Sequence, residues 1–409
     1  MTMKCLFDKA ERDLFEYFQM LEQTEIINTA RILKAFSKYE VAQRHFAPST
    51  GYGYNDTGRE TLESIYAEIF QTESALVRPH IASGTHAISL CLFGLAIPGD
   101  HILSVTGKPY DTLDQVLGLN GLLTGSLKEM NVDFSYVNLK PDGQVDIKAV
   151  IAAIQPNTRI LMLQRSCGYE WRPSILPEDM QSIFEYVKKN HSNCITMVDN
   201  CYGEFVCDCE PSHLGADICV GSLIKNPGGG LAPTGGYIVG SQEAVNRISY
   251  RLTAPGIGKE IGSYAGSYLP FYQGLFLAPH TVTQALKTAA LAGAVFEKLQ
   301  IPTMPASQSK RSDIIQAACL QKKEKLITFC RNIQQNSPVD SMVCPEPWDM
   351  PGYSCDIIMA SGSFIAGSSL ELSADAPLKE PYNLFIQGGL TYAHGKLALM
   401  SAMESIMAL

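Results

Sequence analysis

The sequence predicts an α/β protein in which helices cover a mainly parallel β-sheet. Short apolar runs with strand composition alternate with helical patterns between residues 77 and 225, and this order is typical of parallel sheets. The length of 409 residues exceeds what a single core normally holds, so we expect at least two domains. A hydrophobic content of 46% with 18% charged residues indicates a globular chain.

The first helix of the alternating region is predicted at 58–71. Thr57 and Glu60 fit a capping box in front of it, and Leu62 and Ile65 follow at helical spacing. Strands are expected at 77–82, 101–105, 134–137, 160–163 and 195–198, and helices at 87–95, at 113–117, at 147–154 with Asp146 as N-cap, and from Pro177 onward.

The pattern divides the chain into three parts. Residues 1–45 are amphipathic and mostly helical, and we expect an arm that docks on another subunit. Residues 46–290 form the large domain. A helical stretch at 284–299 carries the boundary, and residues 291–409 form a smaller C-terminal α/β domain. The strands expected there lie at 357–360 and 384–387.

Charge and composition exclude several kinds of partner. The net charge of −9 and the pI of about 5.4 argue against nucleic acid and anionic membranes, and no run reaches the ~18 apolar residues of a membrane span. Cysteines such as Cys91 and Cys219 lie in apolar runs, where cysteine packs as a small hydrophobe. Cys207 and Cys209 are too closely spaced for the usual zinc pattern. We therefore expect a cytoplasmic protein without a metal site.

Lys225 is a lone lysine just past the apolar run 218–220 and before the glycine-rich loop 228–230. A buried ammonium is costly unless it is paired or neutralised. A desolvated lysine amine can form a Schiff base with a carbonyl. The alternative is a lysine whose stem packs while its head reaches water.

Polar residues also follow two other predicted strands. Ser83, Gly84 and Thr85 lie where a strand turns into a helix, and the free amides of a helix start can bind phosphate. Asp199 ends the run 195–198, where an acid can pair with a pyridinium nitrogen. An ordinary capped helix and a turn aspartate remain the alternatives.

Two further residues complete a candidate site. Ser222, three residues before the lysine, could donate to the same phosphate, and Tyr110 could stack on a cofactor ring. A plain turn serine and core packing are the alternatives. An anion site, a stacking face, an acid and an amine are together what pyridoxal 5'-phosphate requires, and ligands of α/β sheets bind at the carboxyl ends of strands.

Several stretches resemble the pyridoxal-phosphate enzymes of cysteine and methionine metabolism. Residues 198–202, Val-Asp-Asn-Cys-Tyr, resemble their Val-Asp-Asn-Thr-Phe, and residues 83–88 are similar to their phosphate loop. Residues 164–169 and 387–392 resemble the methionine gamma-lyase-like group, which includes aluminium-resistance proteins proposed to be cystathionine beta-lyases. The resemblance covers roughly residues 45–400.

This resemblance implies a fold-type-I enzyme with a seven-stranded-type sheet that holds its cofactor on Lys225. It implies a lyase that eliminates a sulfur group from Cβ or Cγ of an amino acid, with Asp199 facing the pyridine nitrogen and Tyr110 assisting as an acid. Tyr54 and Arg59 would reach the cofactor of a neighbouring subunit, so the protein would be a homodimer or a homotetramer with shared active sites.

The sequence departs from the broad family at two positions. Ile224 replaces the threonine that precedes the family's lysine. The family also binds the substrate carboxylate with a C-terminal arginine, whereas no arginine follows Arg331 here. Arg165 and Arg172 are the candidates to replace it, and a structural ion pair is the alternative for each. An aminotransferase, another lyase on this fold, or a non-catalytic relative remains the alternative function.

Overall fold

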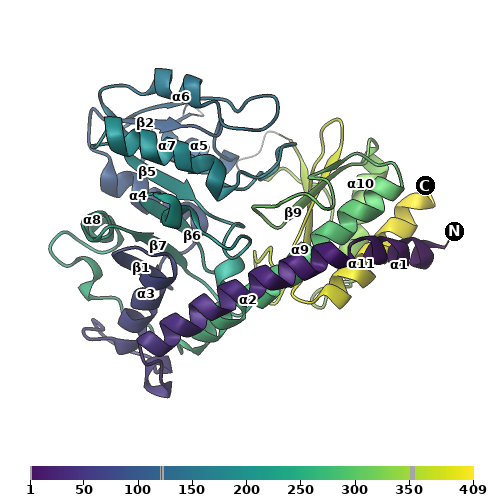
Figure 1. Ribbon diagram of the computed structural model, residues 1–409, viewed down its shortest axis with the longest axis horizontal. Helices are drawn as coiled ribbons and strands as arrows, with labels where there is room; N and C mark the ends of the chain where they lie inside the picture. The colour runs from purple at the N-terminus through teal and green to yellow at the C-terminus, as the bar shows by residue number, and fades with distance from the viewer. Residues whose placement is uncertain (1, 120, 122–123, 351–354) are drawn as a thin grey trace.

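The computed structural model describes residues 2–119, 121, 124–350 and 355–409, and Figure 1 shows two lobes joined by long helices. A seven-stranded sheet forms the larger lobe and a five-stranded sheet the smaller one. The long helix α2 (Phe15–Lys38) crosses both lobes, and the two chain ends lie close together on the smaller lobe.

The large sheet is mixed and mostly parallel, as the sequence predicts. Its strand order is β1-β7-β6-β5-β4-β2-β3, and β7 runs antiparallel to its neighbours β1 and β6. The strands are β1 (Ser74–Arg78), β2 (His101–Ser104), β3 (Asp133–Tyr136), β4 (Thr158–Gln164), β5 (Ile195–Asp199), β6 (Ile218–Ser222) and β7 (Gly236–Gly240).

Helices bury both faces of this sheet. In β4, Ile160 and Met162 pack into the core below α4 (Gly84–Leu95) and α8 (Gln242–Leu252), whereas Leu161 and Leu163 pack into the core below α9 (Leu269–Lys298). This follows because successive strand residues point to opposite faces. The helices of this lobe are α3 (Thr57–Ile69), α4 (Gly84–Leu95), α5 (Asp114–Leu117), α6 (Ile147–Ala153), α7 (Pro177–Asn190), α8 (Gln242–Leu252) and α9 (Leu269–Lys298).

The N-cap of α3 differs from the predicted one. Asp56 caps the helix, and its Oδ1 accepts a hydrogen bond of 3.0 Å from the amide of Arg59. Thr57 is the first helical residue, and the Glu60 carboxylate pairs with the Arg59 guanidinium at 3.1 Å instead of reaching back to the cap. An aspartate and a threonine are both good caps, so the sequence does not distinguish them.

The first strand of the sheet also begins earlier than predicted. β1 ends at Arg78, and the predicted strand at 77–82 is wrong beyond that residue. Pro79 follows directly, and proline cannot donate a ladder hydrogen bond to a neighbouring strand.

Helix α9 is about twice as long as the predicted stretch at 284–299, because it starts at Leu269. It contains Pro279 in its interior, a residue that normally ends a helix. The predicted domain boundary at residue 290 falls inside this helix, and the division into domains stays a prediction.

The smaller lobe is an antiparallel sheet with the order β10-β11-β12-β9-β8. The strands predicted at 357–360 and 384–387 are confirmed as β10 and β12. The elements are β8 (Thr303–Met304), β9 (Ile315–Cys319), α10 (Lys323–Gln335), β10 (Ile357–Ala360), β11 (Ser373–Pro377), β12 (Asn383–Gln387) and α11 (Tyr392–Met407).

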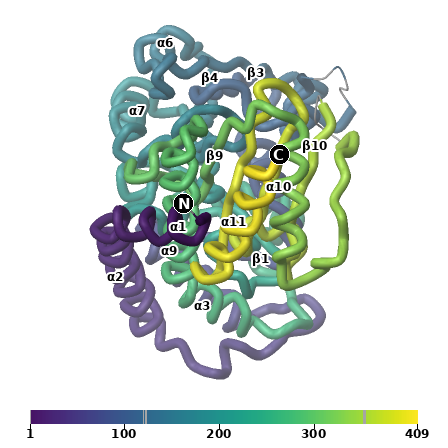
Figure 2. The backbone as a smooth tube through the Cα atoms, turned by 90° about the vertical axis from the view of Figure 1, so that its right-hand side faces the viewer, coloured from purple at the N-terminus to yellow at the C-terminus, as the bar shows by residue number. Residues whose placement is uncertain are grey.

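The N-terminal arm packs on its own chain, and its expected docking on another subunit stays a prediction. Helix α1 (Met3–Asp13) lies against α9 and α11, and α2 lies along α9 (Figure 2). Glu22 pairs with Lys287 of α9 at 2.6 Å, and Glu11 pairs with Lys396 of α11 at 2.5 Å. The arm therefore ties the two lobes together.

Two further features concern the cysteines and the length and hydrophobicity of the helices. All twelve cysteines are free thiols. Within the described ranges, no helix is both long enough and apolar enough to cross a membrane.

Asn28 is a buried polar residue of α2 that bonds the arm to the large lobe. Its substitution tests how much this contact stabilises the protein. Its Nδ2 donates to the carbonyl oxygens of Phe205 and Cys207, both at 3.0 Å. Asn28→Ala leaves both carbonyls without this donor in the core, so it should lower the free energy of unfolding by about 2–4 kcal/mol in urea titrations. Gln23→Ala, at an exposed position of the same helix, is the control and should change it by less than about 0.5 kcal/mol. Equal effects of the two substitutions would contradict the anchoring role.

Candidate active site

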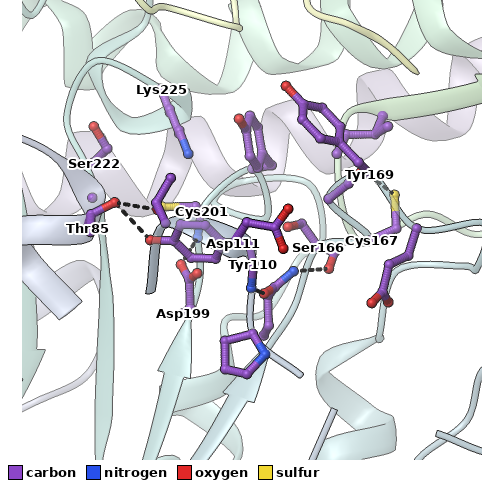
Figure 3. A pocket seen from close by; sticks show the side chains of 18 of the residues that line it. Thr85, Tyr110, Asp111, Ser166, Cys167, Tyr169, Asp199, Cys201, Ser222 and Lys225 are labelled. Carbon is purple, nitrogen blue, oxygen red and sulfur yellow. Dashed lines mark hydrogen bonds between the residues drawn. The ribbon is translucent and has the colours of Figure 1, made fainter. Parts of the chain in front are cut away.

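A cleft of about 440 Å³ lies between the two lobes, at the carboxyl ends of β4, β5 and β6 (Figure 3). This volume is in the range of small-molecule sites. The smaller lobe contributes Ile315, Lys379 and Gln387 to the wall that faces the sheet. The cleft therefore lies where ligands of open α/β sheets bind.

Lys225 points into this cleft from the loop that follows β6 (Figure 3). Its Nζ lies 3.9 Å from the centroid of the Tyr202 ring. Burial lowers the pKa of Lys225, but its neighbours, chiefly Cys201 and Tyr202, outweigh this effect and raise its pKa. The amine is thus held among groups that stabilise its charged form.

The glycine-rich loop after Lys225 packs against α9. A Cβ added to Gly228 would lie 1.9 Å from the Leu223 carbonyl oxygen, and one added to Gly229 would lie 2.2 Å from the Gly274 carbonyl oxygen. Only glycine permits this approach of two backbones. The loop glycines therefore fix the position of Lys225.

The start of α4 forms one side of the cleft. Ser83 is the N-cap, and its Oγ accepts from the amide of His86 at 3.1 Å. The amides of Gly84 and Thr85 have no partner inside the helix, as at every helix start. A Cβ added to Gly84 would lie 3.2 Å from Cys201 Sγ, so glycine keeps this amide end open to a ligand. These amides and the helix dipole favour an anion here.

Tyr110 lies beside this helix start. Its hydroxyl is 3.1 Å from Thr85 Oγ1, and its amide donates to Gln164 Oε1 at 3.3 Å (Figure 3). Burial raises the pKa of Tyr110, so the phenol stays protonated in neutral solution. The ring and its hydroxyl are both presented to the cleft.

Asp199 is the last residue of β5 and is only 4% exposed. Its Oδ1 accepts from the amide of Cys201 at 3.2 Å. Burial raises the pKa of Asp199, and the nearby Lys225 opposes that effect. A cationic partner in the cleft would therefore be favoured, because it would keep the carboxylate charged.

Most of the predicted site residues meet in this cleft. The exceptions are Tyr54, Arg59, Arg165 and Arg172. The residues that line the cleft are Ser83, Gly84, Thr85, Tyr110, Asp199, Ser222 and Lys225. Together they offer an anion site at a helix start, an aromatic face, an acid and an amine, and this donor set fits pyridoxal 5'-phosphate. Their roles toward a cofactor stay predictions. Ile224 also lines the cleft.

Arg59 is turned into its own chain, and its predicted reach to a neighbouring cofactor stays a prediction. It is 1% exposed, and its Nη1 donates to the carbonyl oxygens of Gly53 at 2.8 Å and Gly262 at 3.2 Å. The guanidinium holds the loop before α3 within its own chain. Tyr54 is 62% exposed on that loop, and its contact with another subunit stays a prediction.

The structure also corrects the role predicted for Arg165. This residue is fully buried, and its Nη1 pairs with Glu210 Oε2 at 3.0 Å and donates to Asn200 Oδ1 at 2.7 Å. Its Nε donates to Ser312 Oγ at 2.7 Å. Because these bonds hold the guanidinium behind the cleft, it does not line the site where a substrate carboxylate would bind.

The structure also places Arg172 away from the predicted substrate site, because its guanidinium bonds within its own loop. Its Nε donates to Glu170 Oε2 at 2.7 Å, and its Nη2 donates to the Ser166 carbonyl oxygen at 2.7 Å. The side chain does not line the cleft. It holds together the loop that follows β4.

Several residues that line the cleft were not predicted. Cys201 and Tyr202 lie two and three positions after Asp199, and only this neighbourhood in the sequence could have indicated them. Tyr169 follows β4 of the larger lobe, and Gln387 ends β12 of the smaller lobe. They meet at Asp375, whose Oδ2 accepts from the Tyr169 hydroxyl at 2.9 Å and from Gln387 Nε2 at 2.8 Å.

The architecture defines a class of protein. The large lobe has the fold of type-I pyridoxal-phosphate enzymes. The pyridoxal-5'-phosphate dependent protein YhfS from Escherichia coli superposes with a TM-score of 0.62 at 16% identity, covering 96% of this chain and 97% of that chain. At this identity the similarity shows the fold alone.

The chain belongs to the methionine gamma-lyase family, whose model matches residues 3–407. The uncharacterized protein YnbB of Bacillus subtilis is 50% identical over 400 residues, which are 98% of this chain and 95% of YnbB. A proposed cystathionine beta-lyase involved in aluminium resistance from Listeria monocytogenes is 47% identical. Its crystal structure has a TM-score of 0.96 and the match covers 98% of this chain and 100% of that one. The resemblance found in the sequence is thus confirmed.

Asp375 makes the stability of the protein depend on pH. Burial raises the pKa of Asp375 to about 6, so the folded state binds its proton more tightly than the unfolded state. The stability that Asp375 contributes relative to asparagine is present below about pH 4 and is lost as the pH rises through 6. Between pH 4 and 7, the unfolding free energy of the wild type should fall by about 2–3 kcal/mol relative to Asp375→Asn, because a tenfold change in proton affinity corresponds to about 1.4 kcal/mol.

Urea titrations at a series of pH values measure this difference. Asp356→Asn, at an exposed position next to the same sheet, controls for the change in net charge, and its curve should run parallel to the wild type. A parallel curve for Asp375→Asn would show that burial of this carboxylate has no such effect.

Proposed function

We propose that this protein is a pyridoxal-phosphate-dependent lyase that cleaves a carbon–sulfur bond of a sulfur-containing amino acid, at Cβ or Cγ. The observation that carries the proposal is the cleft in which the amine of Lys225, the acid Asp199, the ring of Tyr110 and the open start of α4 converge. Membership of the methionine gamma-lyase family supports the reaction class.

The cofactor contacts follow from the chemistry of each side chain. The amides at the start of α4, with Thr85 and Ser222, would bind the phosphate. Asp199 would accept a hydrogen bond from the protonated ring nitrogen, and Tyr110 would lie against the ring. When bound, the cofactor supplies an electron sink for a carbanion at Cα of the amino acid.

Two residues of the chain would move protons in this reaction. The amine of Lys225 would accept the proton from Cα, since it points into the cleft from the loop after β6. The Tyr110 hydroxyl stays protonated because burial raises its pKa, so it could donate a proton to the leaving sulfur. The overall change is a thioether amino acid and water giving a thiol, ammonia and a 2-oxo acid.

The first test is whether Lys225 carries the cofactor. Protein supplied with pyridoxal 5'-phosphate should absorb in the visible, and borohydride reduction with peptide mapping should place the adduct on Lys225. Lys225→Ala should lose the adduct, whereas Lys108→Ala, which changes another lysine of the cleft, should retain it. An adduct mainly on a different lysine would contradict the assignment.

The reaction itself is measured with the same preparation. L-cystathionine, L-methionine and L-cysteine are supplied one at a time, and thiol or sulfide, ammonia and 2-oxo acid are quantified together. Equal amounts of the three products support the lyase, and pyruvate or 2-oxobutyrate identifies elimination at Cβ or Cγ. Transfer of the amino group to an added 2-oxo acid without release of thiol would indicate an aminotransferase instead.

We also propose that the protein acts as a homodimer or a homotetramer with shared active sites. The loop before α3 supports this proposal, because its backbone is anchored while its tyrosines face solvent. Gly262 donates to the Tyr52 carbonyl oxygen at 2.9 Å, and Ser263 Oγ donates to the Gly51 carbonyl oxygen at 2.7 Å. The side chains of Tyr52 and Tyr54 are 70% and 62% exposed.

Tyr54 provides the test of a shared site. Tyr54→Ala should weaken cofactor binding at least tenfold, since a hydrogen bond to a charged group contributes about 1.5–3 kcal/mol. Mixing Tyr54→Ala chains with Lys225→Ala chains should restore part of the activity, because one hybrid site carries both intact residues. A chain with both changes is the control and should restore none. Unchanged cofactor affinity of Tyr54→Ala would exclude this role.

A further inference from the structure

The ring of Tyr202 faces the amine that the proposed reaction depends on. Lys225 Nζ lies 3.9 Å from the ring centroid, well inside the roughly 6 Å over which an aromatic face attracts an ammonium. Tyr202 lines the same cleft as Lys225 and Tyr110. The ring therefore contacts the atom that would accept the proton from substrate.

The backbone of Tyr202 is held in an uncommon conformation. Its φ is +70°, in the left-handed region that residues other than glycine seldom adopt. Such a conformation persists only where the surrounding structure determines it, and it is frequent at functional sites. Phe205, at the other end of the same turn, has a φ of +63°.

The turn of residues 200–205 packs on a buried ion pair between Arg165 and Glu210. Glu210 Oε2 accepts from Arg165 Nη1 and from Asn200 Nδ2, both at 3.0 Å, and Glu210 Oε1 accepts from the amide of Phe205 at 2.8 Å. A Cβ added to Gly203 would lie 2.4 Å from Arg165 Cδ. The turn from 200 to 205 is thus wrapped onto the Arg165–Glu210 pair, with Tyr202 at its outer side.

We propose that Tyr202 is a positioning residue that holds the Lys225 amine over its ring, and that the Arg165–Glu210 pair shapes the turn that presents this ring. The significance for catalysis rests on the proposed function, because the amine must stay at one place after it is released from the cofactor and before it accepts a proton. The contact between the Tyr202 ring and the Lys225 amine does not depend on that function, because it is made within the protein itself. The ring favours the charged amine, so removing it should lower the pKa of Lys225.

Other titratable groups also act on the amine and are kept constant in the test. They are Cys201 and Asp199 at the end of β5, Tyr110 from the loop after β2, and Glu204 within the turn. Substitutions of Tyr202 leave each of these groups in place. A change in the pKa of Lys225 therefore measures the effect of the Tyr202 ring.

The experiment measures the pKa of Lys225 in cofactor-free, full-length protein. The rate of reductive methylation at Lys225 is followed by peptide mass spectrometry between pH 6 and 11 in wild type, Tyr202→Phe, Tyr202→Leu and Tyr202→Met. The two non-aromatic variants should lower the pKa of Lys225 by about 0.5–1.5 pH units, as expected from the strength of a cation–π contact. Tyr202→Phe keeps the ring and should stay within about 0.3 pH units of wild type.

A matched control separates this effect from general damage to the fold. Tyr382 in the smaller lobe is also a tyrosine with positive φ, +64°, and Tyr382→Leu should leave the pKa of Lys225 unchanged. An equal shift in Tyr382→Leu, an unchanged pKa in both non-aromatic variants, or a full shift in Tyr202→Phe would each overturn the proposal. If the shift occurs while wild type shows no lyase reaction, the proposed function fails and the positioning role stands.

Discussion

The buried ion pair between Arg165 and Glu210 is the interaction on which the rest of the site depends. Two charges taken out of water are costly unless further hydrogen bonds satisfy them. Here the Asn200 side chain and the Phe205 amide supply those bonds. Because the bonds come from the turn that follows β5, satisfying the pair also shapes that turn. Asp199 stands at the start of the turn, and Tyr202 projects from it into the cleft.

On the other side of the site, close backbone packing fixes the position of Lys225. The loop after β6 is pressed against α9, where Gly228 and Gly274 approach too closely for any side chain. Helix α9 also carries the arm through ion pairs such as Glu22–Lys287. The position of Lys225 is thus set by the same long helix on which the arm packs. Polar contacts between the lobes, such as the one from Tyr169 to Asp375, close the remaining wall.

Much of the fold and part of the site could be predicted because they depend on local rules. Apolar runs placed β4, β5, β6, β10 and β12, and the rule that ligands bind at strand ends brought Asp199 and Lys225 to one place. Arg165 was misplaced by the same rule. It lies at a strand end, but successive residues there point to opposite sides, and its neighbour Gln164 is the one that lines the cleft. The strand-end pattern does not say which side chain faces the ligand.

The sequence by itself determined the layered α/β architecture, the family, and the order of the amine, acid, aromatic and anion-binding residues, because periodicity and short motifs are properties of neighbouring residues. Only the tertiary structure decided where the long polar side chains point. Arg165 finds Ser312, 147 positions away, and Arg59 finds the carbonyl of Gly262, 203 positions away. Buried charges are satisfied by whichever partners the folded chain brings near them, so no local pattern predicts those partners. The contact between Tyr202 and Lys225 arises in the same way, from a turn shaped by a distant ion pair.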